Sequence, residues 1–256
     1  MDSPDCAKRR FLHLSLGSVA GLLLSGCDAL SRSSWFPTLL GVGERLNRAL
    51  QPTLTGRRAM AQEFSEADLS PQFRSNGTAN PEDAAYQALV ASTFADWRLV
   101  VNGLVEHPVQ LTLEQLRAMP SRTQITRHDC VEGWSAIGKW KGVPLASVLA
   151  LARPTATARY VVFHCADPMD EVGTKYYESI DFDDAYHPQT ILAYELNGAT
   201  LPVANGAPLR VRIERQLGYK MAKYIMRVEV VDHFANIGGG RGGYWEDQGY
   251  EWYAGI

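Results

Sequence analysis

Apolar and polar positions alternate along the later part of the chain in short runs, which predict strands separated by turns. The clearest case is "APLRVRIE" at residues 207–214, where the alternation is strict. Further strands are expected at residues 121–130, 158–167 and 223–234, and hairpins with Asn-Gly turns at 97–112 and 190–202.

Short helical patterns interrupt these strands, at residues 80–93, 112–119, 143–152 and 181–187. Asn80 is the expected N-cap of the first helix, with Pro81 behind it. Thr112 and Gln115 have the spacing of a capping box at the start of the second. Hairpins with interspersed short helices favour an α+β fold with mixed sheets over a regular series of parallel βαβ units.

The N-terminal part of the chain has a different character. Basic residues at 8–10 precede the apolar run "LSLGSVAGLLL", which is typical of an export signal and is short for a membrane span. Arg9-Arg10 resembles a twin-arginine signal, used for proteins exported after folding, and "LSGC" resembles a lipoprotein cleavage box. The sequence therefore predicts an export signal at residues 1–26, lipidation of Cys27, and a tether and arm at 27–73. A single domain would follow at 74–256.

The charge of the chain bears on its binding partners, and its cysteine content bears on disulfide formation. The 256 residues carry a formal net charge of -3, which gives no indication of nucleic-acid binding. Residues 206–227 nevertheless hold six Lys or Arg against Glu214. After signal removal and lipidation only Cys130 and Cys165 remain, and in an oxidising compartment they could pair.

Cys130, in "RHDCVEGW", is the main candidate for chemistry. A nucleophile assisted by His128 is one reading, but no orienting residue is evident. The spacing of His and Cys does not match a structural zinc site. "GGGRGG" at 238–243 lacks the strand-then-helix context of a dinucleotide-binding loop. A single thiolate could also bind a soft metal whose other ligands belong to a cofactor.

The segments "TRHDCVEGW" and "KWKGVPL" resemble the molybdenum-ligand region of the sulfite-oxidase superfamily. They are most similar to its bacterial periplasmic branch, which includes the catalytic subunit of methionine-sulfoxide reductases. The resemblance runs over residues 74–232 and includes "RYVVFHCAD" and the stretch from Tyr176 to Ile225. It implies the sulfite-oxidase molybdopterin-binding fold and oxygen-atom transfer at sulfur or another heteroatom.

The resemblance also implies roles for individual residues. Cys130 would be the protein ligand of molybdenum, with Glu132 and Tyr176, or its neighbour Tyr177, in the active site. The implied cofactor-binding residues are Asn76, Cys165, Asn205, Arg210 and Lys223. Because a metal-bound thiolate cannot form a disulfide, both cysteines are expected to be unpaired.

The basic run agrees with this implication, since a pterin phosphate needs cationic donors. The sequence has no Cys-x-x-Cys-His haem motif, so no bound haem is expected and electrons would come from a separate membrane haem protein or cytochrome. The expected enzyme is a molybdenum oxidoreductase on the periplasmic side of the inner membrane, acting on a small-molecule or protein sulfoxide. The alternatives are a binding protein with this fold but no turnover, and a metal-free thiol enzyme.

Overall fold

The computed structural model describes residues 59–256 continuously and, before them, residues 33, 35, 36, 39, 41–43, 46, 50 and 56. The chain divides into two compact units, residues 1–56 and 57–256. Residues 57–73, expected to belong to the arm, thus group with the second unit. The predicted export signal and Cys27 lie outside the described residues. No helix in the described part of the chain combines the length and apolar character that crossing a membrane requires.

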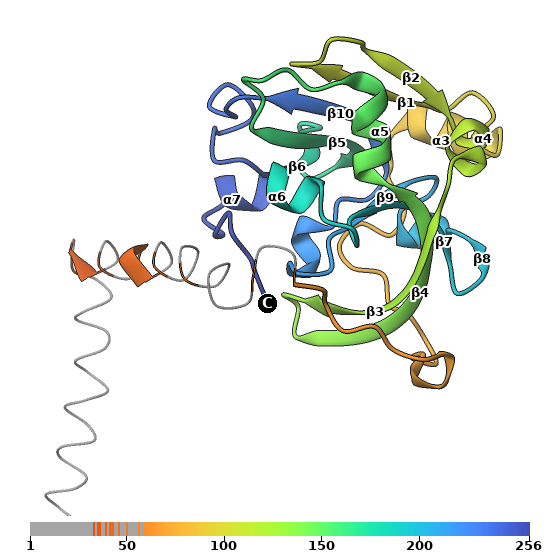
Figure 1. The fold of residues 1–256 in the computed structure, drawn as a ribbon, viewed down its shortest axis with the longest axis horizontal. Helices are drawn as coiled ribbons and strands as arrows, with labels where there is room; N and C mark the ends of the chain where they lie inside the picture. The colour runs from red at the N-terminus through yellow and green to blue at the C-terminus, as the bar shows by residue number, and fades with distance from the viewer. Residues whose placement is uncertain are drawn as a thin grey trace, which may run out of the picture. The chain divides into compact units, whose positions relative to one another are not determined.

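Residues 57–256 are built around two sheets (Figure 1). The first has the order β2-β1-β10-β5-β6, in which β1 runs parallel to β10 and the other neighbours are antiparallel. Its strands are β1 (Arg98–Gly103), β2 (Val109–Thr112), β5 (Tyr160–Pro168), β6 (Lys175–Asp181) and β10 (Ile225–Val231). The mixture of parallel and antiparallel neighbours agrees with the expected class.

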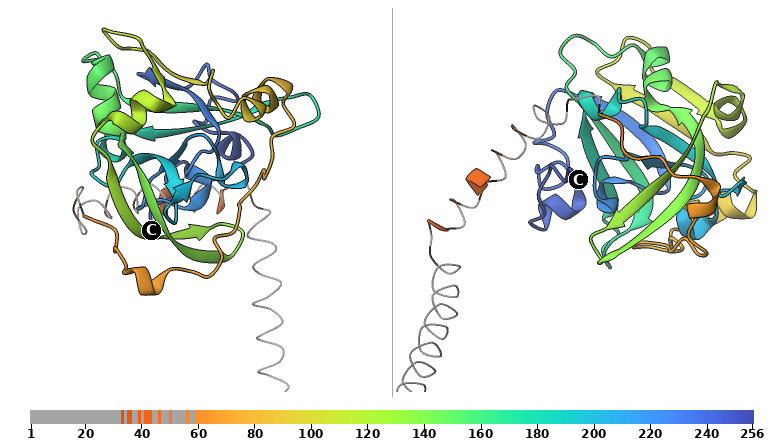
Figure 2. Two further views of the ribbon diagram at one scale, coloured as in Figure 1. Left: turned by 90° about the vertical axis from the view of Figure 1, so that its right-hand side faces the viewer. Right: turned by 60° about the horizontal axis from the view of Figure 1, so that its bottom comes forward.

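The second sheet has the order β3-β4-β7-β8, and β9 pairs with β7. Its strands are β3 (Arg122–Cys130), β4 (Trp134–Pro144), β7 (Ile191–Leu196), β8 (Ala199–Thr200) and β9 (Arg210–Arg212). β3 and β4 form a long curved hairpin at one side of this unit (Figures 1 and 2). This hairpin carries Cys130 at its end.

Short helices join the strands and confirm the expected α+β class. The α-helices are α3 (Ala84–Ala91), α4 (Leu113–Ala118), α5 (Leu145–Ala152), α6 (Phe182–Ala185) and α7 (Tyr244–Asp247). The 3-10 helices are η1 (Glu66–Asp68), η2 (Val203–Asn205) and η3 (Gly218–Lys220). One core of fully buried apolar side chains joins both sheets with α5: Leu99 and Phe163 come from the first sheet, Leu192 and Val211 from the second, and Leu149 from α5.

Most local expectations are confirmed. The capping box at α4 is present, with Gln115 N donating to Thr112 Oγ1 at 2.9 Å and Thr112 N donating to Gln115 Oε1 at 2.8 Å. The N-cap of α3 is Asp83, whose side chain accepts from Tyr86 N, so the assignment to Asn80 was wrong. The sequence patterns did not predict β4 and β6 as strands.

The hairpin of β1 and β2 exists, but its turn was predicted wrongly. Asn102 and Gly103 are the last residues of β1, and residues 104–108 form the connection. The pair stays in the strand because β1 has a second neighbour: Asn102 pairs with Glu229 and Gly103 with Val230 of β10. This long-range pairing prevailed over the local turn preference.

Candidate functional site

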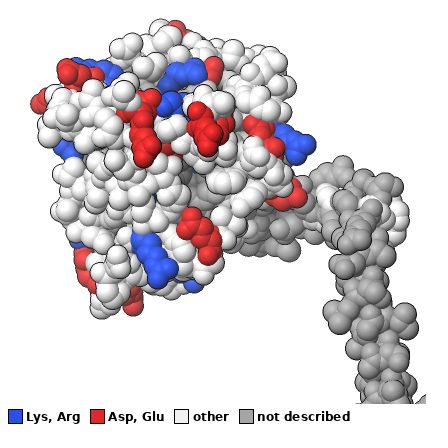
Figure 3. Space-filling model, turned by 180° about the vertical axis from the view of Figure 1, so that it is seen from behind, with Lys and Arg blue, Asp and Glu red and all other residues white. Residues whose placement is uncertain are grey.

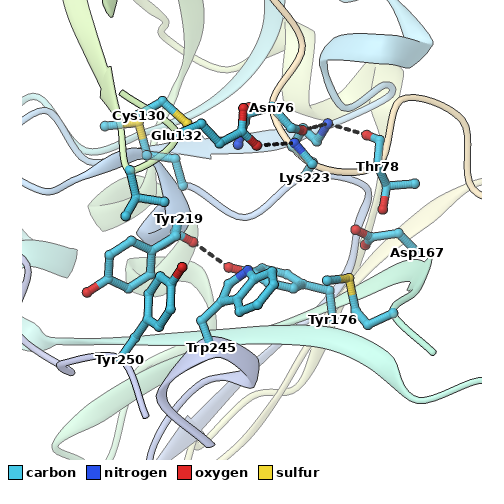
Figure 4. A pocket seen from close by; sticks show the side chains of 15 residues that line it. Asn76, Thr78, Cys130, Glu132, Asp167, Tyr176, Tyr219, Lys223, Trp245 and Tyr250 are labelled. Carbon is cyan, nitrogen blue, oxygen red and sulfur yellow. Dashed lines mark hydrogen bonds between the residues drawn. The ribbon is translucent and has the colours of Figure 1, made fainter. Parts of the chain in front are cut away.

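One cavity, of about 190 Å³, opens where the ends of several elements converge (Figure 4). Its lining includes the loop 76–78, Cys130 at the end of β3 and residues 131 and 132 of the following turn. The β5–β6 hairpin contributes Asp167 on β5, Met169 in the connecting loop and Tyr176 on β6. The segment 218–223 and the C-terminal residues 245 and 250 complete it. These segments are far apart in the sequence, so only the tertiary fold creates the cavity.

Five of the predicted site residues line this cavity: Asn76, Cys130, Glu132, Tyr176 and Lys223. The fold therefore brings together residues from positions 76 to 223. Their chemical roles remain predictions from the family resemblance.

The other three predicted residues lie outside the cavity lining. Arg210 is fully buried and donates from Nη1 to the carbonyl of Asn205 at 3.0 Å. Asn205 donates weakly from Nδ2 to the carbonyl of Arg74 at 3.5 Å. Cys165 is buried in the apolar core. Arg210 and Asn205 thus contact each other, whereas Cys165 makes no part of the cavity wall.

Cys130 is the last residue of β3 and is 8% exposed. Burial is the main cause that raises the pKa of its thiol. Glu132, just beyond it, accepts from Trp134 Nε1 at 2.9 Å and from Gly77 N at 3.2 Å. These bonds, that of Trp134 first, lower the pKa of Glu132 and keep a carboxylate at the mouth of the cavity.

The geometry argues against a thiol–histidine pair. Strand β3 extends to Cys130, as the sequence predicts, so Cys130 and His128 share its buried face. His128 Nδ1, however, lies 2.9 Å from Arg212 Nη1 and 3.3 Å from Met221 Sδ. Burial, with Arg212 next, lowers the pKa of His128 well below its usual value. In protein without a metal, Cys130 therefore has a raised pKa, and His128 contacts Arg212 and Met221 and does not act as its base.

The basic run of residues 206–227 is largely internal, and most of its cations have acidic partners. Arg212 pairs with Glu214 at 2.6 Å with both side chains fully buried. Lys220 pairs with Glu178 at 2.5 Å and with Glu246 at 2.6 Å. The run is thus not a solvated basic face. On the face seen in Figure 3, acidic and basic side chains are scattered among uncharged ones.

Lys223 and Arg210 differ from these paired cations. Lys223 Nζ donates to the backbone carbonyls of Asn76 at 2.6 Å and Ala204 at 3.1 Å, and also to that of Thr78. Arg210 donates to the carbonyl oxygens of Asn205 and Met221, and its Nε has no partner among residues 59–256. Among the described residues, neither cation has a carboxylate within salt-bridge distance.

Two buried cations that lack a carboxylate within salt-bridge distance are costly in a folded protein, unless an anion joins them. Burial, followed by the charge of Arg210, lowers the pKa of Lys223 to about 7. Asn76 Oδ1, which is also buried and has no hydrogen-bond partner in the described structure, belongs to the same region. An anionic group with polar ring edges would contact Lys223 and Asn76, which line the cavity, and its negative charge would offset that of Arg210, which lies outside the lining. These residues therefore fit a phosphate-bearing pterin.

Tyr176, not Tyr177, faces the cavity. The hydroxyl of Tyr176 donates to the carbonyl of Tyr219 in the cavity wall (Figure 4). Tyr177 points away, and its hydroxyl donates to Asp247 Oδ2 at 2.5 Å. The alternation of side chains along β6 separates the two.

Both described cysteines are free, as expected from the metal-ligand interpretation. Burial raises the pKa of Cys165 well above its usual value, so its sulfur stays a neutral thiol in the core. Within the part of the chain that is described, no three His, Cys, Asp or Glu side chains gather as a metal site. A metal held by Cys130 would need ligands from a cofactor.

The sequence interpretation missed several lining residues. Asp167 is 4% exposed, and none of the described residues forms a hydrogen bond with its Oδ1. Burial raises its pKa to about 6. Tyr219, Trp245 and Tyr250 form the aromatic side of the cavity (Figure 4). Asp167 ends the segment "RYVVFHCAD", and Tyr219 lies in the stretch from Tyr176 to Ile225, both of which carry the family resemblance. No local pattern, however, marks a residue that reaches the site through tertiary contacts.

Comparison of this sequence with known proteins identifies the protein family to which it is similar. Residues 87–236 match the oxidoreductase molybdopterin binding domain. The chain is 40% identical over 250 residues to the Azospira oryzae protein named "Putative protein-methionine-sulfoxide reductase subunit YedZ1", covering 97% of this chain and 88% of the relative. It is also 40% identical over 145 residues to the protein-methionine-sulfoxide reductase catalytic subunit MsrP of Xanthomonas axonopodis pv. citri, covering 53% of this chain.

The chain spans 45% of that Xanthomonas protein and 53% of MsrP from Ralstonia nicotianae, to which it is 35% identical over 178 residues, 66% of this chain. Among solved structures, the sulfane dehydrogenase SoxCD of Paracoccus pantotrophus aligns with a TM-score of 0.48 and 24% identity, over 54% of this chain and 38% of that one. The domain match confirms the molybdopterin-binding fold that the sequence resemblance implied. The chain therefore belongs to the oxidoreductase molybdopterin-binding domain family.

Proposed function

We propose that this protein reduces sulfoxides, with methionine sulfoxide in free or protein-bound form as the substrate class. The observation that carries the proposal is a pair of buried cations near Cys130: Lys223, which lines the same cavity, and Arg210, which lies outside the lining. Among the described residues, neither has a carboxylate within salt-bridge distance. The names of the Azospira and Xanthomonas relatives support the choice of substrate.

The proposed function assigns separate metal-binding and cofactor-binding roles to residues of this chain. Cys130 would bind the metal through its sulfur, and binding would release the thiol proton despite the raised pKa. Lys223, Arg210 and Asn76 would hold the anionic and polar parts of the cofactor. When bound, the molybdenum–pterin group supplies two-electron redox chemistry and exchange of an oxygen atom with the substrate.

Sulfoxide reduction also consumes two protons along with two electrons. Asp167 lines the cavity, and its Oδ1 has no hydrogen-bond partner in the described part of the chain. Its pKa of about 6 lets it gain and release a proton near neutral pH. Glu132, with its lowered pKa, stays ionised at the opposite side of the cavity. Asp167 is therefore the better placed of the two to donate protons to the departing oxygen.

We further propose that the protein works on the periplasmic side of the bacterial inner membrane. "LSGC" and Arg9-Arg10 in the sequence support export after folding and a lipid anchor at Cys27. Electrons would come from a separate membrane haem protein or a cytochrome. Mass spectrometry of the N-terminal peptide from membranes would test the anchor: an acylated Cys27 supports it, and an unmodified chain starting elsewhere rejects it.

The function is tested with exported holoprotein and a reduced viologen dye as electron donor. Molybdenum content is measured first, and then dye oxidation is followed with methionine sulfoxide, dimethyl sulfoxide, an N-oxide, and, with an electron acceptor, sulfite. Turnover of sulfoxides with about one molybdenum per chain supports the proposal. Molybdenum-loaded protein that oxidises sulfite but reduces no sulfoxide would reject it, and activity in metal-free protein would favour the thiol alternative.

A further inference from the structure

The cavity has two chemically different sides (Figure 4). Cys130, Asn76 and Lys223 lie on one side, which offers sulfur, amide and ammonium groups. The rings of Tyr219 and Trp245 lie on the other, together with Tyr250. A molecule in the cavity therefore meets a polar surface at one end and an aromatic surface at the other.

The aromatic wall, defined as Tyr219, Trp245 and Tyr250, is assembled within the protein itself. The rings of Trp245 and Tyr250 lie 5.3 Å apart at 30°, and Tyr219 meets Tyr250 edge-on at 5.3 Å. Tyr250 N donates to the carbonyl of Trp245 at 2.9 Å. The hydroxyl of Tyr219 donates to the carbonyl of Glu251 at 2.6 Å. The wall is thus preorganised, which lowers the entropic cost of binding against it.

The helix α7 that carries Trp245 is fixed by the two residues that follow it. Glu246 accepts from Lys220 Nζ at 2.6 Å, and both side chains are 1% exposed. Asp247 accepts from the hydroxyl of Tyr177 at 2.5 Å and from Gly239 N at 2.6 Å. Residues 246 and 247 therefore anchor α7 to the protein interior while Trp245 contributes to the cavity.

Two of the three wall residues stand outside the family domain. The match to that domain ends at residue 236, whereas Trp245 and Tyr250 follow it, and Lys223 and Arg210 lie within it. Cofactor-binding and wall residues thus come from different parts of the chain. Changes in the wall can alter which substrate fits without altering the cations.

We propose that the aromatic wall is the specificity-determining surface for the alkyl chain beside the substrate sulfur. This inference rests on the proposed sulfoxide reduction and names the part of the substrate that is recognised. Aromatic faces attract methyl and methylene groups and sulfur, and two-torsion side chains do so at low entropic cost. With the chain on the wall, the S=O group points to the polar side.

The same surface disfavours small inorganic oxyanions. An ion such as sulfite would lose hydration against Trp245 and Tyr250 and gain no hydrogen bonds from their ring faces. The wall therefore selects for a substrate with a carbon chain, such as a methionyl side chain, over a compact anion.

The test compares two sulfoxides that differ in chain length, using wild-type holoprotein and the Trp245→Ala variant. The substrates are N-acetylmethionine sulfoxide methylamide and dimethyl sulfoxide. Loss of contact with about two methylene groups should lower kcat/KM for the longer substrate about tenfold, mainly through KM. For dimethyl sulfoxide the loss should stay within about threefold, because it lacks those groups.

Two further variants control the experiment. Trp245→Phe keeps an aromatic face and should recover most of the lost kcat/KM. Tyr186→Ala removes an equally accessible ring, 45% exposed against 39% for Tyr250, that does not line the cavity. It should leave the ratio of the two substrates unchanged. Molybdenum content should be the same in all variants.

Binding without turnover gives a second readout. Calorimetric titration of unreduced holoprotein with N-acetylmethionine sulfoxide methylamide should show about tenfold weaker binding in Trp245→Ala. A variant that loses both substrates equally, or neither, overturns the role of the wall. A wild-type protein that reduces no sulfoxide at all rejects the proposed function instead, so the two failures are distinguishable.

Discussion

Lys220 and Lys223 are buried lysines only three positions apart, and we expect their loss to have different consequences. Lys220 is held between Glu178 and Glu246. Lys223 donates to carbonyls and has no carboxylate in salt-bridge distance within the described chain. Changing each in turn to Met, which keeps the apolar stem, therefore separates a structural ion pair from a cofactor-binding cation.

The expected magnitudes follow from the partners. Lys220→Met leaves two carboxylates buried without a cation, which should lower the free energy of unfolding by about 3–5 kcal/mol. Lys223→Met removes charge-assisted contacts to an anionic cofactor of about 1.5–3 kcal/mol, so affinity for molybdopterin should fall about 10- to 150-fold. The effect of Lys223→Met on the stability of cofactor-free protein should be smaller, because removal of a buried charge without a salt-bridge partner offsets the lost hydrogen bonds.

Two measurements check this contrast. Urea unfolding of cofactor-free protein gives the free energy of unfolding, and molybdenum and pterin content of protein isolated from cells gives occupancy. The Lys220 variant should be destabilised, and whatever folds should bind cofactor. The Lys223 variant should fold and lose cofactor. Full molybdenum occupancy in Lys223→Met, or the same loss of stability in both variants, would refute the reasoning.

Three more outcomes are expected. Cys130→Ser should abolish activity and change the electronic spectrum of the molybdenum, because an alkoxide is a harder donor than a thiolate; full activity would end the ligand assignment. Cys165→Thr should be tolerated, and mass spectrometry of unreduced active protein should find no peptide linking residues 130 and 165. Since burial lowers the pKa of Lys223 to about 7, the unfolded chain binds more protons above that value. Cofactor-free protein should therefore gain stability from about pH 7 to about pH 8.5, and urea unfolding should show a smaller gain in Lys223→Met.

Local signals in the sequence were sufficient for most of the elements. The capping residues Thr112 and Gln115 form both of the bonds their spacing predicts, since a capping box involves only neighbouring backbone groups. Asn102-Gly103 has an equally strong turn signal, yet it lies in β1 because pairing with β10 holds it there. A strand partner 125 or more residues away leaves no trace in a local pattern.

The sequence by itself determined the family resemblance, the α+β class and the importance of Cys130, because each depends on a continuous segment of chain. It also provided the six cations of residues 206–227, but not their roles. Only the tertiary structure decided that Lys220 has two carboxylate partners and that, within the described chain, Lys223 and Arg210 have none in salt-bridge distance. Burial and the distance between side chains set these differences, and both arise from contacts between segments that folding alone brings together. Trp245 and Asp167 likewise reach the cavity only through tertiary contacts.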